Sequence, residues 1–261
     1  MQAYGLLATV LLCVISAISS ARAQDKVVDI PTRNGVSQRF LLIRTAEPKA
    51  AVILFAGGHG GLQLSETGSP RWGNNNFLVR SARLFAAQGF TVAVVDAPSD
   101  KQSPPYLSGF RLLPEHAADI KAVIAWLKNE LKVPVWLIGT SRGTQSVAAV
   151  STALGRSDGP DGVVLTSTIL NDPRSRPVPD MALEKLTVPV LVVHHEQDAC
   201  RVCLFRDMPR LMEKLSALPR KELMTLRGGE NQGDPCEALA YHGFNGLEAE
   251  VVRRIAAWIT Q

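Results

Sequence analysis

The stretch that decides the fold is VWLIGTSRGTQSVAAV, residues 135–150. Its first four residues are apolar, as in a strand buried on both faces, and its second half suits a helix. Between them, Gly139-Thr140-Ser141-Arg142-Gly143 matches the pattern G-x-S-x-G. A serine on a sharp strand-to-helix turn needs small neighbours two residues away on each side, because the turn brings backbones close together. We therefore expect Ser141 to project above a sheet at a helix N-terminus, where negative charge is favoured. The alternative is an ordinary turn with a capping serine.

Apolar runs and helical patterns alternate on both sides of this stretch. We expect strands over residues 27–30, 40–44, 51–55, 90–95, 133–138, 162–165, 188–194 and 222–226, and helices over residues 77–88, 115–132, 141–154, 205–218 and 247–259. Short apolar strands separated by helices predict an α/β fold with a mostly parallel sheet covered on both faces. The first two strands have no helix between them and should form an antiparallel edge. The connection 166–185 is too short for a helical cap domain, and the loop 62–76 is long and polar. Both segments should line the mouth of the site.

The composition limits the classes of function. The chain has 261 residues, of which 46% are hydrophobic, enough for the core of one large domain. The net charge is only +4, and the basic residues are scattered along the chain. Nucleic-acid binding needs a clustered basic face, so we expect no nucleic-acid partner.

The first 23 residues are predicted to be an export signal. Leu6 to Ile18 is a nearly unbroken apolar run, and Ala21-Arg22-Ala23 matches the small-x-small cleavage pattern. The run is shorter than the roughly 20 residues that span a bilayer, although an uncleaved anchor is the alternative because no Lys or Arg precedes the run. We therefore expect a signal peptide over 1–23 and one domain over 24–261. The domain should be periplasmic or secreted, without stable membrane anchoring after cleavage.

A serine hydroxyl needs a base to become a nucleophile, and the base needs an acid to orient it. In a sheet with this turn the acid and then the histidine follow the serine along the chain. Of the three histidines after Ser141, His194 and His195 end a predicted strand, and the side chain of at least one of them is expected to pack in the core. His242 lies in a Gly-containing loop before the last helix, so we expect His242 to be the base.

The acid should follow the strand that ends near His194. Asp198 lies a few residues beyond that strand and is the preferred candidate, with Glu196 second. Asp96 also follows a strand, but it precedes Ser141 and is interpreted as a structural turn residue.

An oxyanion that develops during acyl transfer needs preorganised N–H donors. We expect one donor to be the N–H of Arg142 and the other to be the N–H of Gly58, with His59 as the alternative to Gly58. Gly58 and His59 belong to the segment Gly57-Gly58-His59-Gly60-Gly61, whose glycines let the backbone approach a bound carbonyl. A phosphate-binding loop is the other interpretation of this segment, but no G-K-S/T follows it. The Arg142 side chain could steer an anionic substrate or form a surface salt bridge.

Four segments together resemble the α/β-hydrolase superfamily: FAGGHGG (55–61), GTSRG (139–143), HHEQDAC (194–200) and CEALAYHGF (236–244). They are similar to small exported bacterial members with little or no cap. The resemblance implies an eight-stranded sheet, the triad Ser141, Asp198 and His242, and hydrolysis of a small-molecule ester through an acyl-enzyme. It implies no cofactor and no metal. The sequence departs from many relatives at Ala56, where they carry His.

Other chemistries remain open at this stage. A peptidase or a thioesterase would use the same three side chains, and a binding protein could retain the scaffold without turnover. A metalloenzyme built on His194 and His195 is disfavoured because the second His of H-E-x-x-H is missing.

Three cysteines remain after removal of the signal, which contains Cys13. Export favours one disulfide with one thiol left over. If Asp198 and His242 meet, a Cys200–Cys236 bond would join their loops, with Cys203–Cys236 as the alternative. The C-x-x-C spacing of Cys200 and Cys203 is a weak metal or redox signal, because no second such pair exists.

Overall fold

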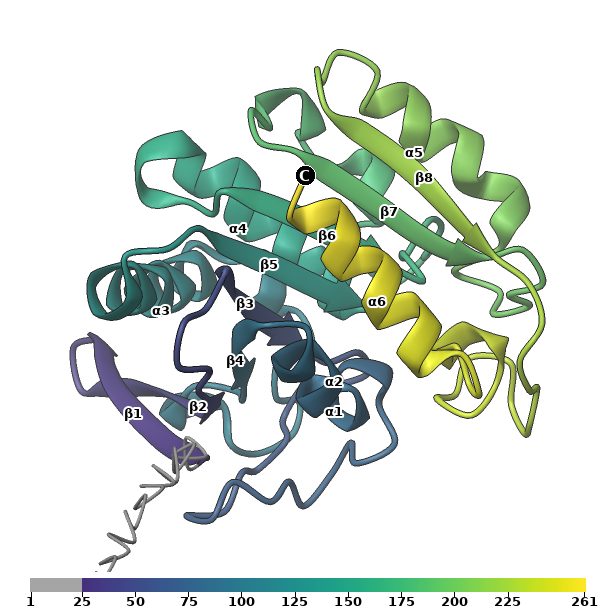
Figure 1. The fold of residues 1–261 in the computed structure, drawn as a ribbon. Coiled ribbons are helices and arrows are strands. Elements are labelled where there is room, and N and C mark those ends of the chain that lie inside the picture. The colour runs from purple at the N-terminus through teal and green to yellow at the C-terminus, as the bar shows by residue number, and fades with distance from the viewer. Residues whose placement is uncertain (1–24) are drawn as a thin grey trace, which may run out of the picture.

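The computed structural model describes residues 25–261, so the expected signal over 1–23 lies outside the described residues. Eight strands form one sheet in the order β1-β2-β4-β3-β5-β6-β7-β8 (Figure 1). The strands are β1 Lys26–Arg33, β2 Val36–Ile43, β3 Ala50–Phe55, β4 Phe90–Val95, β5 Val135–Thr140, β6 Gly162–Thr166, β7 Val190–His195 and β8 Lys221–Leu226. The β1–β2 and β2–β4 pairs are antiparallel and the other pairs are parallel, which confirms the predicted antiparallel edge.

Helices cover both faces of this sheet. They are α1 Phe77–Arg80, α2 Ala82–Ala87, α3 Pro114–Leu131, α4 Gly143–Asp158, α5 Met208–Lys214 and α6 Glu248–Ile259. Short 3₁₀ turns are η1 Ser99–Lys101, η2 Phe110–Leu112, η3 Val178–Asp180, η4 Leu183–Lys185, η5 Phe205–Asp207 and η6 Tyr241–Gly243. The apolar faces of α3, α4 and α5 pack in one core layer, and those of α1, α2 and α6 pack in the other (Figure 1). Every residue of the central strands β3 to β7 is buried, which is why their sequences read as continuous apolar runs.

Three predicted helices were wrong in extent. The helix expected over 77–88 is divided at Ser81, whose carbonyl accepts from both Leu84 and Phe85 and tightens the turn. The helix expected over 205–218 begins as a 3₁₀ turn and is α-helical only over α5. The helix expected from Ser141 begins at Gly143, because Ser141 has a left-handed backbone conformation.

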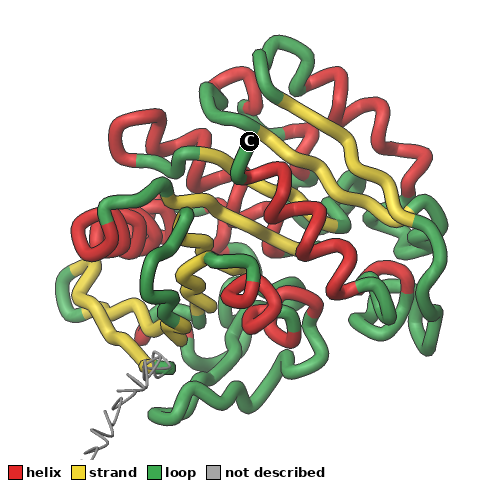
Figure 2. Tube along the Cα trace, viewed as in Figure 1, coloured by secondary structure: helices red, strands yellow, loops and turns green. Residues whose placement is uncertain are grey.

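Parallel strands bring their carboxyl ends to one edge of the sheet, where long loops gather (Figure 2). Asp96, just after β4, holds one of these loops in place. Its buried carboxylate accepts hydrogen bonds from the N–H groups of Leu62 (2.7 Å), Gln63 (3.1 Å), Leu64 (2.8 Å) and Ala97 (2.7 Å). Asp96 is therefore the structural turn residue that we expected. Within residues 25–261, every helix is too short or too polar to cross a bilayer.

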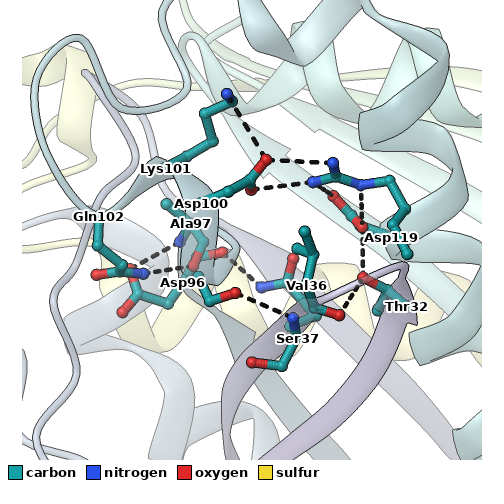
Figure 3. Close-up of polar contacts among 12 residues, drawn as sticks. Thr32, Val36, Ser37, Asp96, Ala97, Asp100, Lys101, Gln102 and Asp119 are labelled. Carbon is teal, nitrogen blue, oxygen red and sulfur yellow. Dashed lines mark hydrogen bonds and ion pairs between the residues drawn. The ribbon is translucent and has the colours of Figure 1, made fainter.

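A buried ion pair ties the edge strand β1 to α3 (Figure 3). The Asp119 carboxylate is fully buried and accepts from Arg33 Nε at 2.8 Å, Arg33 Nη2 at 3.0 Å and Thr32 Oγ1 at 2.5 Å. The same guanidinium also pairs with Asp100 at 3.0 Å in η1. These contacts raise the pKa of Arg33. Removing the arginine would leave a buried carboxylate without its cation.

Arg33→Gln should therefore lower the free energy of unfolding by about 3 kcal/mol, the usual cost of leaving a buried charge unpaired. The matched control is Arg44→Gln, which breaks a pair with Glu130 in which both side chains are more than 40% exposed, at 44% and 47%. That change should cost less than about 1 kcal/mol. Urea unfolding of both variants measures the difference, and equal midpoints would contradict the importance of the Asp119 contacts.

Candidate active site

Ser141 lies on a sharp turn between β5 and α4. Its φ angle is +51°, a region that residues with a side chain rarely occupy. The Ser141 N–H donates to the Thr166 carbonyl on β6 at 3.0 Å. The Ser141 carbonyl accepts from the Thr144 N–H at 2.9 Å and from Thr144 Oγ1 at 2.6 Å. Bonds on both sides of the residue thus hold this strained turn.

The glycines of the G-x-S-x-G pattern allow backbones to touch. A Cβ atom on Gly139 would lie 2.4 Å from the Gly143 carbonyl oxygen, and a Cβ on Gly143 would lie 2.2 Å from the Phe55 carbonyl oxygen. The first turn of α4 therefore packs directly against the backbone at the end of β3. This contact explains why small residues stand on both sides of Ser141.

The structure brings Asp198 and His242 into contact, although 44 residues separate them. His242 Nδ1 lies 2.8 Å from Asp198 Oδ2, while Asp198 Oδ1 accepts from the Cys200 N–H at 2.9 Å. Ser167 Oγ donates to the His242 carbonyl at 2.6 Å and fixes the loop of His242 to the end of β6. Within the described residues, the buried His242 Nε2 has no hydrogen-bond partner. Ser141 and His242 both line one cavity of about 410 Å³.

The other candidates for acid and base make different contacts, and His194 Nε2 also lies 3.6 Å from Asp198 Oδ2. Glu196 pairs with Arg227 at 2.5 Å, and this contact lowers the pKa of Glu196. His194 is buried, its Nε2 lies 2.6 Å from the Cys203 carbonyl oxygen, and burial lowers its pKa to about 4. His195 Nε2 lies 2.9 Å from the Gly228 carbonyl oxygen, and its ring stacks on Tyr241. Both histidines of β7 are thus held in the protein interior by hydrogen bonds and packing.

A disulfide joins the loops that carry Asp198 and His242. The bonded pair is Cys200 and Cys236, and Cys203 is a buried thiol whose pKa burial raises. The ligand atoms of Cys200, Cys203 and His242 lie within 4.8 Å of one another. Because the Cys200 sulfur is bonded to Cys236, it is not a thiolate that could bind a metal.

The glycine-rich loop lies against the turn that carries Ser141. A Cβ atom on Gly57 would lie 3.0 Å from the Ser141 Cβ, and Gly58 has a φ of +55°. Within residues 25–261, the N–H groups of Gly58 and Arg142 donate no hydrogen bond. The His59 ring is stacked between Trp72, at a centroid distance of 3.7 Å, and Tyr106, at 4.3 Å. These two aromatic rings hold the loop from outside.

A buried arginine holds the same loop from inside. Arg111 Nη2 donates to the Ala56 carbonyl at 3.0 Å and to the Gly58 carbonyl at 3.4 Å, and Nη1 donates to Ser146 Oγ at 2.7 Å. A Cβ atom on Gly60 would lie 2.3 Å from Nη2. No carboxylate of the described residues pairs with this guanidinium. Burial without such a partner lowers the pKa of Arg111, and the positive charge of Arg142 adds to the effect.

The Arg142 side chain forms an ion pair with Asp172, with Nη1 and Oδ2 2.8 Å apart. Of the two interpretations left open for this side chain, the salt bridge is the one that the structure contains. Asp172 Oδ1 also accepts from the Arg174 N–H at 3.0 Å, so the acid orders the loop after β6 as well.

Two supporting residues, Arg111 and Ser167, were not predicted from the sequence. Arg111 stands in the apolar run Phe110-Arg111-Leu112-Leu113, and a charge among apolar residues was a signal that could have suggested a buried role. Ser167 had no such signal, because a serine after a strand is common in loops. Only the proximity of β6 to the His242 loop gives it a partner.

The contact between Gly143 and Phe55 predicts a severe effect of one methyl group. Gly143→Ala should lower the free energy of unfolding by about 3 kcal/mol or more, because the new Cβ meets backbone that cannot rotate away. Ser157→Ala puts the same side chain on the exposed last turn of α4 and should stay within about 0.5 kcal/mol. Thermal or urea unfolding compares the two, and a stable Gly143→Ala variant would refute the close approach.

Comparisons with known proteins agree with this architecture. No protein-family model and no curated protein matches the chain. An esterase from Pyrococcus furiosus aligns over 90% of this chain and 90% of its own, with a TM-score of 0.62 and 15% identity. A cold-adapted esterase from an Arctic intertidal metagenomic library aligns over 89% and 93%, with a TM-score of 0.60 and 14% identity. An α/β serine hydrolase without a lid from Xanthomonas campestris aligns over 89% and 95%, with a TM-score of 0.54 and 16% identity. The chain therefore has the α/β-hydrolase fold, in the form that lacks a lid.

Proposed function

We propose that this protein is a serine hydrolase that cleaves small carboxylic esters, with Ser141 as nucleophile, His242 as base and Asp198 as the orienting acid. One observation carries the proposal. Asp198 binds Nδ1 of His242, and this leaves the buried Nε2 without a partner at a cavity that Ser141 also lines. An imidazole held by a carboxylate on one nitrogen and free on the other is arranged to accept a proton from a hydroxyl.

The reaction follows from these groups. His242 Nε2 accepts the Ser141 proton while Oγ forms a bond to the substrate carbonyl carbon. The tetrahedral intermediate then expels the alcohol, which takes its proton from His242 and leaves an acyl-enzyme. Water, activated by the same nitrogen, attacks the acyl-enzyme and releases the acid and free Ser141.

The oxyanion of the intermediate needs donors that point at it before the reaction begins. The N–H groups of Arg142 and Gly58 are our candidates, since both are free of other partners within residues 25–261. Arg111 binds the carbonyls of Ala56 and Gly58 on the opposite side of the loop. We assign Arg111 as a positioning residue, because fixing these carbonyls also fixes the direction of the N–H groups between them.

The esterase names of the structural neighbours favour an ester over a peptide or thioester. The chemistry uses no metal or cofactor. The disulfide between Cys200 and Cys236 suits an oxidising compartment, in agreement with export to the periplasm or beyond and with the expected signal over 1–23.

Fluorophosphonate labelling followed by peptide mapping tests the proposed nucleophile. We expect label on Ser141 in the wild type, no label in Ser141→Ala, and labelling slowed about 10⁴-fold or more in His242→Ala and Asp198→Asn. Ser151→Ala removes a buried hydroxyl from α4, the helix that follows Ser141. Ser151 lines neither of the two cavities that Ser141 borders, so this variant should label normally.

A wild-type protein that neither labels nor hydrolyses any member of a panel of aryl esters, acyl thioesters and peptides would overturn the proposal and favour a binding protein. Label on Ser141 with turnover of thioesters or peptides alone would keep the nucleophile and change the substrate class.

Arg111 variants test the positioning of the glycine loop. Arg111→Met should lower kcat on an aryl ester about 100-fold, the size of a lost oxyanion contact, while KM changes less than about threefold. Arg111→Lys keeps a positive donor and should recover part of kcat. The exposed Arg156→Met serves as the control for removing a guanidinium. A lower melting temperature, with kcat and KM changing to a similar extent, would show that Arg111 has a purely structural role.

A further inference from the structure

Ser141 also lines a second cavity. Its volume is about 570 Å³, and it shares Gly58, Ser141 and Cys236 with the first cavity. Ser141 therefore borders two cavities, and the disulfide-bonded Cys236 lines both. An ester has two parts, an acyl chain and an alcohol, so the two cavities suit one part each.

The position of His242 indicates which cavity binds the alcohol and which binds the acyl chain. It lines the first cavity and is absent from the lining of the second. In the proposed mechanism His242 protonates the leaving alcohol, which must therefore lie within reach of its Nε2. The alcohol then occupies the first cavity, beside Trp72 and Asn76, and the acyl chain extends into the second.

The second cavity carries an excess of positive charge. Arg142, Arg174 and Arg201 line it, together with one acid, Asp234. They come from three separate segments: the N-terminal end of α4, the loop after β6 and the loop after β7. Asp172 neutralises Arg142, whereas the Arg174 and Arg201 side chains pair with no described residue. The first cavity, by contrast, has one arginine, Arg71, and one acid, Glu237.

Apolar residues line the same cavity. Ile169, Ala199, Val202 and Pro235 contribute to the wall of the cavity, and Ile169 is fully buried. A chain of methylene groups with an anionic end would place its apolar part against this wall and its charge near the two unpaired guanidinium groups. Guanidinium groups bind carboxylates through charge-assisted hydrogen bonds.

We propose that this arginine-lined cavity is an acyl subsite for chains that end in a carboxylate, so that the preferred substrates are monoesters of dicarboxylic acids. The inference rests on the proposed function, because it takes Ser141 as the nucleophile and His242 as the group that protonates the alcohol. In the acylation step Ser141 Oγ bonds to the carbonyl carbon, and the bond to the alcohol oxygen breaks. The distal carboxylate takes no part in either change and serves only in binding.

The test compares two substrates of equal acyl length, the para-nitrophenyl monoester of adipic acid and para-nitrophenyl hexanoate. We expect wild-type kcat/KM to be higher for the adipate ester. The ratio of the two values should fall about tenfold in Arg174→Gln/Arg201→Gln, because two nearby positive charges are lost. Asp234→Asn removes the opposing charge, retains the oxygen that accepts from the Cys236 N–H, and should raise the ratio about threefold.

The matched control is Arg156→Gln/Arg253→Gln. It removes two exposed arginines that line neither cavity, so the net charge changes equally while the ratio stays at the wild-type value. Added salt should lower the ratio in the wild type and have little effect in Arg174→Gln/Arg201→Gln. Melting temperatures verify that all variants are folded.

Hydrolysis of both esters at equal kcat/KM by the wild type, or a ratio that Arg174→Gln/Arg201→Gln leaves unchanged, would overturn the acyl subsite while the proposed esterase function stands. Failure to hydrolyse either ester, together with no fluorophosphonate label on Ser141, would reject the proposed function and the subsite with it.

Discussion

The candidate site depends on the close approach of α4 to the end of β3. Gly143 lies so near the Phe55 carbonyl that a single added carbon would overlap with it, and Gly139 lies equally near Gly143. This approach fixes the N-terminus of α4 beneath Ser141 and imposes the left-handed conformation of that residue. Such a conformation costs roughly 1–2 kcal/mol, which the bonds to Thr166 and Thr144 and the packing of the helix offset. A rigid backbone contact thus sets the direction of one hydroxyl.

The parts around Ser141 are held by contacts of different strength. The loop of Asp198 is tied to the loop of His242 twice, by the hydrogen bond between the two side chains and by the disulfide of Cys200 and Cys236. In the chain-entropy description such a crosslink stabilises a fold by roughly 3–4 kcal/mol, mainly by restricting the unfolded chain. The glycine-rich loop has no covalent tie and depends on Arg111 inside and on two aromatic rings outside.

Charge is distributed unevenly around Ser141. Arg111 is buried without an acid of its own, which costs stability and leaves a positive field close to the place where negative charge would develop. Arg142 is neutralised by Asp172, whereas Arg174 and Arg201 face the second cavity without partners. Arg174 and Arg201 thus make the second cavity more positive than the first, and this asymmetry is the basis of the preference that we infer.

Local patterns in the sequence determined much of this protein. All eight strands, the antiparallel edge and the turn at Ser141 could be predicted. A buried parallel strand and a glycine-flanked turn each have a characteristic pattern of residues that are adjacent in the sequence. The order of acid and histidine after the serine pointed to Asp198 and His242, and the two side chains do meet. The division of one helix at Ser81 was not predicted, since its apolar periodicity continues across the break.

Only the tertiary structure decided which distant groups become partners. Arg142 could have faced a substrate or an acid, and the fold of the loop after β6 placed Asp172 beside it. The contacts of Arg111 and Ser167, and the two cavities that Ser141 lines, depend on segments far apart in the chain. Periodicity and turn signals report only what lies within a few residues, so a sequence can specify each element and still not show which side chains their packing brings together.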